Sequence, residues 1–173
     1  MFPEFTEEQK LLQDTIRNFA EKEVAPLAAE IDREERFPSE TFRKLAAMGL
    51  LGITVPAELG GAGAGYTEMC IVTEELAAVC LSTSAVWGTH ALLCIDNIRR
   101  NGSEDQLRAY LPPLCSGEKI GGLAMTEPFA GSDVMSMRLR AERRDGEYVL
   151  NGSKIFISNG PVGDVFVIYA KTD

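Results

Sequence analysis

The sequence predicts an α+β fold, with an all-α helical bundle domain over residues 1–117 and an antiparallel β-barrel-like domain over residues 118–173 that is incomplete. Apolar residues recur at helical spacing from Phe5 to about Leu114, and from Lys119 the spacing changes to the two-residue period of strands. Two dipeptides that are typical of tight hairpins lie between the predicted strands. Apolar residues make up 45% of the chain, which is enough to bury a core.

The first two helices are predicted from the residues at their ends. Thr6 and Gln9 have the spacing of a capping box, and the apolar residues that follow share one side of a long helix. We expect this helix to bend or end near Pro26, because proline cannot donate the helical hydrogen bond. Pro38-Ser39 opens a shorter helix, which Gly49 closes.

Three further helices complete the predicted bundle. The glycine-rich segment VPAELGGAGAGY predicts a loop, after which we expect Thr67 to cap the third helix. A fourth helix is predicted over Thr83–Asn101, stopped by the glycine that follows. Ser103 and Gln106 repeat the capping-box spacing for a fifth helix, and we expect Pro112-Pro113 to limit it.

The second part of the chain is predicted to form strands. Asp145-Gly146 and Asn151-Gly152 each separate β-prone runs, so they predict a meander of three antiparallel strands. The run DVFVIYA, rich in β-branched and aromatic residues, predicts a further strand shortly before the chain stops. Four or five strands with unpaired edges make an unfinished sheet, so we expect that sequence is missing beyond Asp173.

The charge of the chain argues against a nucleic-acid partner, because the formal net charge is −9 and the pI is near 4.7. A local basic cluster along a predicted strand is interpreted as a solvated face; it consists of Arg138, Arg140, Arg143 and Arg144. The N-terminus MFPEFTEEQK does not resemble a secretory signal, and no stretch has the length of a membrane span. We therefore expect a cytoplasmic protein, or one in the mitochondrial matrix if a transit peptide has been removed.

The cysteines and the single histidine do not predict a metal site. Cys70, Cys80, Cys94 and Cys115 contain no C-x-x-C pair, which fits neither a zinc ribbon nor a redox dithiol. We expect reduced, mostly buried thiols, as in a cytosol-like compartment. His90 lies in an apolar stretch without a second histidine or a clear acidic partner, and we interpret it as a structural histidine.

The segment AMTEPFAGSD is the strongest candidate for a ligand loop, because it follows a strand predicted over Lys119–Thr126. Its backbone N–H groups and the hydroxyls of Thr126 and Ser132 would lie at the rim of a sheet, and Gly131 permits close approach of a planar polar ligand. It matches neither the Rossmann nor the Walker A pattern. Taken alone, the loop is explained better by ordinary turn and cap residues.

Several motifs resemble, in the same order, those of the acyl-CoA dehydrogenase family. They are TEEQ, GLLGITVPAELGGAGAGY, GTHALLCI with RRNGSEDQLRAYLPPLCSGE, AMTEPFAGSDV, LNGSKIFISNGP and DVFVIYAKTD, and together they cover essentially the whole chain. The most specific are TEP-x-AGSD and LNG-x-K-x-(aromatic)-I-(Ser/Thr)-NG. NGSEDQ, YLPPLCSGE, MSMRLRAE and YAKTD look most like the branch that acts on isovaleryl-CoA and other branched-chain thioesters.

The resemblance implies an FAD cofactor and the residues that bind it. In relatives, the loop matching Leu123–Ser132 lines the isoalloxazine ring, the hydroxyl at Thr126 bonds the flavin edge near N5, and Ser132 also touches the acyl-CoA substrate. A second flavin-contacting strand matches Phe156–Ser158, where relatives often have Trp and Thr. The implied cofactor-binding residues are Leu123, Ala124, Met125, Thr126, Glu127, Pro128, Phe129, Ala130, Gly131, Ser132, Phe156, Ile157 and Ser158. Phe129 departs from the family, in which this position is commonly small or polar.

The activity implied is the α,β-dehydrogenation of a short or branched-chain acyl-CoA, in fatty acid or branched-chain amino acid catabolism. The resemblance also implies electron-transfer flavoprotein as the electron acceptor and a homotetramer. In the family, the catalytic base is a Glu from a C-terminal helical domain that this sequence does not contain, so we assign no catalytic residue. Glu127 is the acid nearest the flavin loop, but it does not match that base.

Two alternatives remain open. The first is a non-catalytic product, either a truncated fragment or a subunit that contributes a surface to a partner chain carrying the base. The second is an acyl-CoA oxidase or a flavin monooxygenase of the same superfamily. The acyl pocket is also undecided: relatives form its floor partly from the fourth helix, where Trp87, Leu92 and Leu93 lie. Trp87 either shortens this pocket or packs in the bundle core, and the core is favoured.

Overall fold

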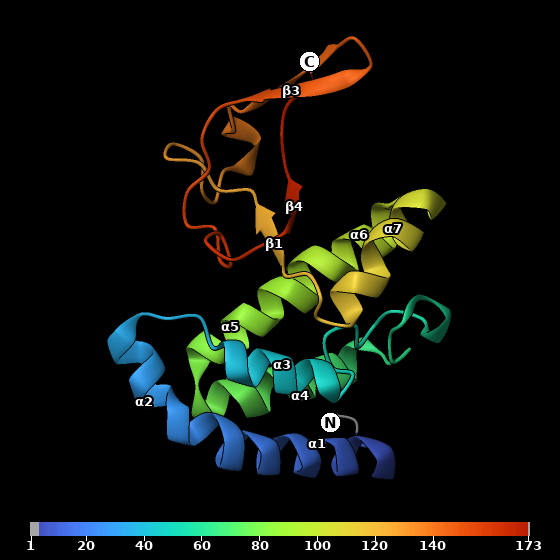
Figure 1. The fold of residues 1–173 in the computed structure, drawn as a ribbon, viewed down its shortest axis with the longest axis vertical. Coiled ribbons are helices and arrows are strands. Elements are labelled where there is room, and N and C mark those ends of the chain that lie inside the picture. The colour runs from blue at the N-terminus through green and yellow to red at the C-terminus, as the bar shows by residue number, and fades with distance from the viewer. Residues whose placement is uncertain (1–3, 173) are drawn as a thin grey trace.

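The computed structural model describes residues 4–172. Helices form one end of the molecule and the strands extend from the other, so the α+β class is confirmed (Figure 1). The strands form two two-stranded sheets, and residues 4–172 contain no closed barrel. Within the same residues, none of the helices combines the length and the apolar character needed to cross a membrane.

The first helical stretch changes its winding just before Pro26, where a bend or an end was predicted. α1 (Glu7–Phe19) begins with the predicted capping box of Thr6 and Gln9. A π-helical segment, η1 (Ala20–Val24), leads into α2 (Ala25–Glu34), which has Pro26 in its first turn. Proline is tolerated there because the first turn of a helix does not use its N–H groups within the helix.

The next two helices are α3 (Ser39–Ala47) and α4 (Tyr66–Val79), of which α4 packs against α1. α3 follows Pro38, and Gly49 after it has a φ of 72°, as the predicted helix end requires. α4 has Gly65 as its N-cap, so the predicted cap at Thr67 is wrong. The Glu68 carboxylate accepts the Gly65 N–H at 2.9 Å, which satisfies the helix start without a hydroxyl.

The predicted fourth helix is a continuous stretch of three parts. These are α5 (Leu81–Gly88), the π-helical η3 (Thr89–Ile95) and α6 (Asp96–Asn101), and the stretch ends at Gly102 as expected. α7 (Glu104–Cys115) has the predicted Ser103–Gln106 capping box. The prediction that Pro112-Pro113 limits this helix is wrong, because it continues to Cys115. Burial of Leu111, Leu114 and Cys115 outweighs the lost backbone bonds.

Two clusters of buried apolar side chains form the core. The larger joins α1, α3, α4 and α5, and its members include Ile16, Leu45, Leu51, Val72, Leu76 and Trp87. The smaller joins η3 and α7, and Val165 and Val167 of the strand region pack against it. The bundle and the strands therefore share part of one core. A bidentate ion pair between Arg17 and the buried Glu75 also ties α1 to α4, with N–O distances of 3.0 and 2.8 Å.

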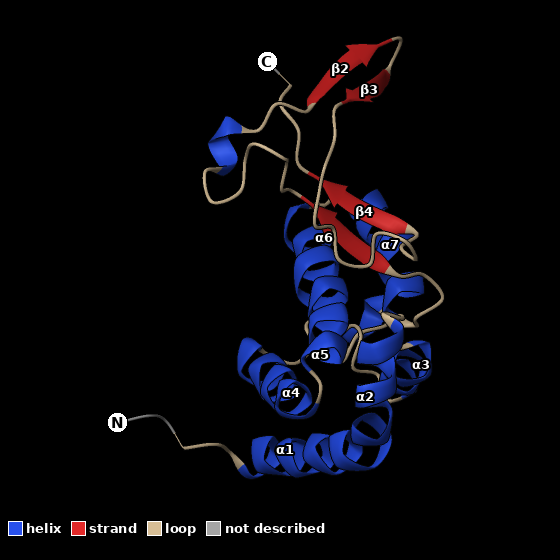
Figure 2. Cartoon of the chain, turned by 90° about the vertical axis from the view of Figure 1, so that its left-hand side faces the viewer, coloured by secondary structure: helices blue, strands red, loops and turns tan. Residues whose placement is uncertain are grey.

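The strands confirm one predicted hairpin. β2 (Arg140–Arg144) pairs antiparallel with β3 (Glu147–Asn151). The turn between them is Asp145-Gly146, with φ angles of 51° and 89°, which is the backbone that Asp-Gly favours in tight hairpins. Figure 2 shows this hairpin at the end of the molecule farthest from α1.

The prediction of a third strand in the meander is wrong. Residues 153–158 are irregular: Phe156 has a φ of 55°, and the Ile155 N–H bonds the Thr126 carbonyl rather than β3. This detour carries the chain back toward the bundle, so β4 (Val165–Ile168) pairs parallel with β1 (Gly121–Ala124) rather than antiparallel. The β1–β4 pair lies beside α6 and α7 (Figure 2).

The close approach of β1 to η3 depends on Gly121. A Cβ added there would lie 2.7 Å from Cys94 Sγ, so Gly121→Ala should lower the free energy of unfolding by about 1–3 kcal/mol through overpacking. Gly131→Ala is the control, because its added Cβ would meet nothing within 4 Å. Urea unfolding of both variants of the full-length protein tests this, and equal losses would contradict it.

Candidate functional site

The loop singled out by the sequence borders a hollow of about 140 Å³ between the helical stretch and the strand region. Three segments meet here: η3, the end of β1 with the loop after it, and the irregular segment before Asn159. The residues that line the hollow are Thr89, Leu93, Leu123, Met125, Thr126, Phe156, Ile157 and Ser158.

The π-helical winding of η3 lies where the helix borders this hollow. Thr89 and Leu93 are four residues apart and reach it from the same side of the helix. Leu93 was expected in a pocket, whereas Thr89 was missed. The signal in the sequence that could have found Thr89 is its position four residues before Leu93, which places both residues on one side of a helix. π-helical segments inside α-helices are frequent at functional sites.

The structure brings together six of the thirteen predicted cofactor-binding residues in this hollow: Leu123, Met125, Thr126, Phe156, Ile157 and Ser158. The other seven do not line it. Ala124, Glu127 and Ala130 are buried, whereas Pro128, Phe129, Gly131 and Ser132 are exposed on the loop that continues from the hollow.

Phe129 lies at the tip of a tight turn. Glu127 and Ala130 exchange backbone hydrogen bonds of 2.9 and 3.2 Å, which closes the turn around Pro128 and Phe129. The Phe129 ring is 77% exposed, and the Arg138 guanidinium lies 5.2 Å from its centroid. The bulky side chain is therefore exposed beside Arg138 and does not line the hollow.

Phe156 presents an uncovered aromatic ring at the edge of the hollow. The residue is 87% exposed. Its backbone is in the left-handed region, which is strained for a residue other than glycine and therefore rare. The backbone bond from Ile155 to Thr126, at 3.0 Å, holds the preceding residue against the loop. The hydroxyls of Thr126 and Ser158 belong to the two segments on either side of this bond.

Glu127 is turned into the protein rather than toward the hollow. Its carboxylate accepts the Arg138 N–H at 2.6 Å, the Leu139 N–H at 2.9 Å and the Lys154 ammonium at 3.0 Å. These bonds, led by the one from Arg138, lower the pKa of Glu127 to about 2. The carboxylate is thus a fully engaged anion at neutral pH, which agrees with leaving it unassigned as a base.

His90 is structural, as the sequence indicates. It is fully buried next to Thr89, where Nδ1 accepts the Gly121 N–H at 2.9 Å and Nε2 donates to the Leu114 carbonyl at 3.0 Å. Burial lowers the pKa of His90 to about 4, so the ring is neutral at physiological pH. The ring therefore links the helical region to the first residue of β1.

The four cysteines are free thiols, and three of them are buried as expected. Cys70 is the exposed one. Burial raises the pKa of Cys94 and of Cys115 to about 11, so neither carries thiolate at neutral pH. These two side chains act as core residues.

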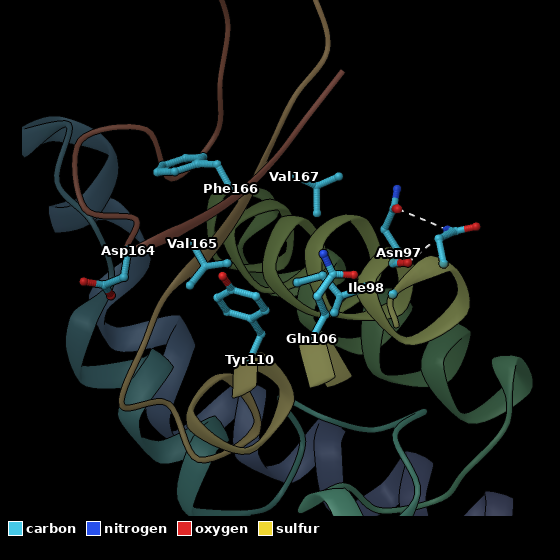
Figure 3. A pocket seen from close by; sticks show the side chains of 10 residues that line it. Asn97, Ile98, Gln106, Tyr110, Asp164, Val165, Phe166 and Val167 are labelled. Atoms are coloured by element: carbon cyan, nitrogen blue, oxygen red, sulfur yellow. Dashed lines mark hydrogen bonds between the residues drawn. The ribbon is translucent and has the colours of Figure 1, made fainter. Parts of the chain in front are cut away.

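Two further hollows lie nearby. One of about 410 Å³ shares Leu93, Leu123 and Met125 with the candidate site, and is bordered by Asn97, which donates to the Tyr169 hydroxyl at 2.8 Å. The other, of about 460 Å³, lies between α6, α7 and β4, on the far side of Asn97. In Figure 3, Gln106 and Tyr110 face Val165 and Val167 across it. Leu92 and Leu93, which were expected at the floor of an acyl pocket, both line the hollow of about 410 Å³. The hollow of about 460 Å³ was not predicted.

Comparison with known proteins agrees with the motif order along the chain. Residues 6–118 match the family model "Acyl-CoA dehydrogenase, N-terminal domain", and residues 122–173 match "Acyl-CoA dehydrogenase, middle domain". The mitochondrial isovaleryl-CoA dehydrogenase of Bos taurus is 50% identical over 169 residues, which are 96% of this chain and 40% of that protein.

Two solved structures superpose on the whole chain. The glutaryl-coenzyme A dehydrogenase–glutaryl-CoA complex is 39% identical, with a TM-score of 0.94, and this chain covers 45% of it. The FAD complex of PigA is 32% identical, with a TM-score of 0.92, and this chain covers 46% of it. The chain thus spans less than half the length of the proteins it matches.

Proposed function

This chain belongs to the acyl-CoA dehydrogenase family, and we propose that it supplies part of an FAD-dependent enzyme that dehydrogenates an acyl-CoA thioester between its α- and β-carbons. In this proposal, residues 1–117 form the N-terminal helical domain and residues 118–173 the first part of the middle β-domain. The observation that carries the proposal is the meeting of Thr126 with Phe156 and Ser158 at one hollow, from segments about thirty residues apart.

The residues at this hollow fit a flavin. An exposed aromatic ring, the three hydroxyls of Thr89, Thr126 and Ser158, and an apolar wall suit a flat heterocycle with a polar edge. Beyond the hollow, an added Cβ at Gly131 would meet open space, which leaves room for close approach of a ligand. We propose that FAD is held by Leu123–Ser132 and Phe156–Ser158, and that Ser132 also touches the substrate. Glu127 and Ala130, both buried, would contribute through the shape of the loop.

The chemistry of the reaction divides the roles. Bound FAD would supply the redox chemistry, accepting a hydride from the β-carbon. The side chains of Leu93, Leu123 and Met125 would exclude water from the reacting carbons. Removal of the α-proton needs a carboxylate within hydrogen-bond reach. The residues that line the hollow include no acid, and we propose that this base is a Glu of a further helical domain, as the family resemblance implies.

The proposed substrate is a short or branched acyl-CoA. Thr89 and Leu93 line the hollow from the helix side, and we propose that they limit the length of the acyl group. The identity with an isovaleryl-CoA dehydrogenase supports the same class. We further propose electron-transfer flavoprotein as the acceptor, a homotetramer as the assembly, and the cytoplasm or the mitochondrial matrix as the compartment. The free cysteines agree with a reducing environment.

The first test removes the Thr126 hydroxyl while keeping its shape. Thr126→Val in the full-length protein should weaken FAD binding by about fivefold, the loss of one neutral hydrogen bond. Thr15→Val is the control, because that exposed hydroxyl bonds only its own helix, at Leu11. Titration of the apoprotein with FAD measures both variants. Equal affinities would remove Thr126 from the site, and absence of FAD binding by the unmodified protein would overturn the function.

The substrate and the acceptor are tested by turnover. Isovaleryl-CoA should be oxidised faster than a long straight-chain acyl-CoA when electron-transfer flavoprotein is present. The reverse order would contradict the short or branched substrate. Fast peroxide formation with oxygen alone would instead support the oxidase or monooxygenase alternative.

A further inference from the structure

A buried ion pair lies directly behind the proposed flavin site without lining it. Glu127 Oε1 and Lys154 Nζ are 3.0 Å apart, and their side chains are only 5% and 7% exposed. Burying two charges costs free energy unless their remaining bonding capacity is also satisfied. Because the pair is buried, its presence cannot be explained as ordinary charge on a solvated surface.

The hydrogen bonds of the pair connect three separate segments. The Glu127 carboxylate accepts the backbone N–H groups of Arg138 and Leu139, at the start of the hairpin. The Lys154 ammonium donates to the Met125 carbonyl at 2.8 Å as well as to Glu127. Lys154 thus bonds the residue before Thr126 and the residue after it. Lys154 itself belongs to the irregular segment that carries Phe156.

These contacts join the two walls of the hollow. Met125 and Thr126 line one wall, and the other begins at Phe156, two residues after Lys154. Between them, the Ile155 N–H bonds the Thr126 carbonyl at 3.0 Å. The Lys154 bonds and this backbone bond thus connect the two walls directly.

We propose that Glu127 and Lys154 are positioning residues: their buried ion pair holds the Thr126 wall and the Phe156–Ser158 wall at the separation that accepts the flavin ring. The proposal rests on the proposed function, because it concerns the same site. It also gives the acid of the TEP motif and the lysine of the LNG-x-K motif one shared role, although they are 27 residues apart.

The competing explanation is a purely structural role, in which the pair only stabilises the strand region. Removing one partner leaves an uncompensated buried charge under either explanation, so a single variant loses stability in both cases. Removing both charges relieves that penalty. The Lys154 bond to Met125 is still absent in the double variant, and only the positioning role predicts that flavin binding then remains impaired.

The experiment compares Lys154→Met with the double variant Glu127→Gln/Lys154→Met in the full-length protein. Glu142→Gln is the matched control, because Glu142 pairs with Arg144 in the same strand region but is 48% exposed. Each protein is measured for the thermal midpoint of the apoprotein, the FAD dissociation constant, and the visible circular dichroism of bound flavin, which reports the surroundings of the ring.

In the double variant we expect the thermal midpoint to rise above that of Lys154→Met, while the FAD dissociation constant stays at least tenfold above the control and the flavin spectrum differs. An FAD dissociation constant that recovers together with the midpoint, or an unchanged spectrum, would overturn the positioning role. If Lys154→Met does not fold, the FAD dissociation constant and flavin spectrum of the double variant are compared with those of Glu142→Gln, and this comparison tests the positioning role. Failure of the unmodified protein and the control to bind FAD would instead overturn the proposed function.

Discussion

Trp87→Ala should lower the free energy of unfolding by about 3–5 kcal/mol, because it removes a large side chain from the middle of the helical core. Trp87 is fully buried, and its Nε1 donates to the Leu50 carbonyl at 3.0 Å. The alanine would leave a cavity and an unpaired carbonyl. Urea unfolding of the full-length protein measures the loss.

Two controls separate the causes. Trp87→Phe keeps most of the apolar volume but loses the donor, so it should cost about 1–3 kcal/mol. Leu11→Ala, at a position that is 68% exposed, should change the stability by less than about 0.5 kcal/mol. A loss at Trp87→Ala no larger than that at Leu11→Ala would contradict its place in the core.

Trp87→Phe also tests whether Trp87 forms part of the acyl pocket. Trp87 was expected either to shorten this pocket or to pack in the core, and it does not line the candidate hollow. The preference for acyl chain length should therefore be similar in Trp87→Phe and in the unmodified protein. A shift of the preference toward longer chains would assign Trp87 to the pocket floor instead.

His90 should make the protein less stable as the pH falls from about 6.5 to about 4. The folded protein holds the ring neutral with a pKa of about 4, below the ordinary value of 6.5, because burial disfavours its charged form. The unfolded chain binds the proton first, so this stabilisation is complete above pH 6.5 and is lost as the pH falls. The full effect is about 3 kcal/mol, of which about 2 kcal/mol should be lost by pH 5.

The measurement compares unmodified protein with His90→Gln at pH 7 and pH 5. Glutamine cannot titrate, so subtracting the two unfolding free energies removes the contribution of the many surface carboxylates. The stability advantage of the unmodified protein should shrink by about 2 kcal/mol at pH 5. An advantage of equal size at both pH values would show that burial does not depress the pKa of His90.

Local patterns predicted the elements that depend on a few neighbouring residues. The capping boxes at Thr6 and Ser103 and the Asp145-Gly146 hairpin are confirmed, because each rests on bonds made within four residues along the chain. The structural interpretation of His90 is confirmed as well. Its two partners, at Leu114 and Gly121, were not predictable from the apolar stretch around it.

The errors occur where distant contacts outweigh local preference. Pro112-Pro113 should end a helix by its own chemistry, but the burial of Leu111 and Leu114 carries α7 past it. Asn151-Gly152 was expected to start a third antiparallel strand. The following residues bond Thr126 instead, and this detour brings β4 beside β1 in parallel.

The sequence by itself determined the order of helices and strands, the family resemblance and the two motifs that border the candidate site. These depend on residue type and on short spacing. Only the tertiary structure decided that Thr89 joins the site, that Phe129 does not line it, and that Glu127 is paired with Lys154 behind it. Burial and pairing across tens of residues depend on how all the segments pack together, which no single stretch of sequence specifies.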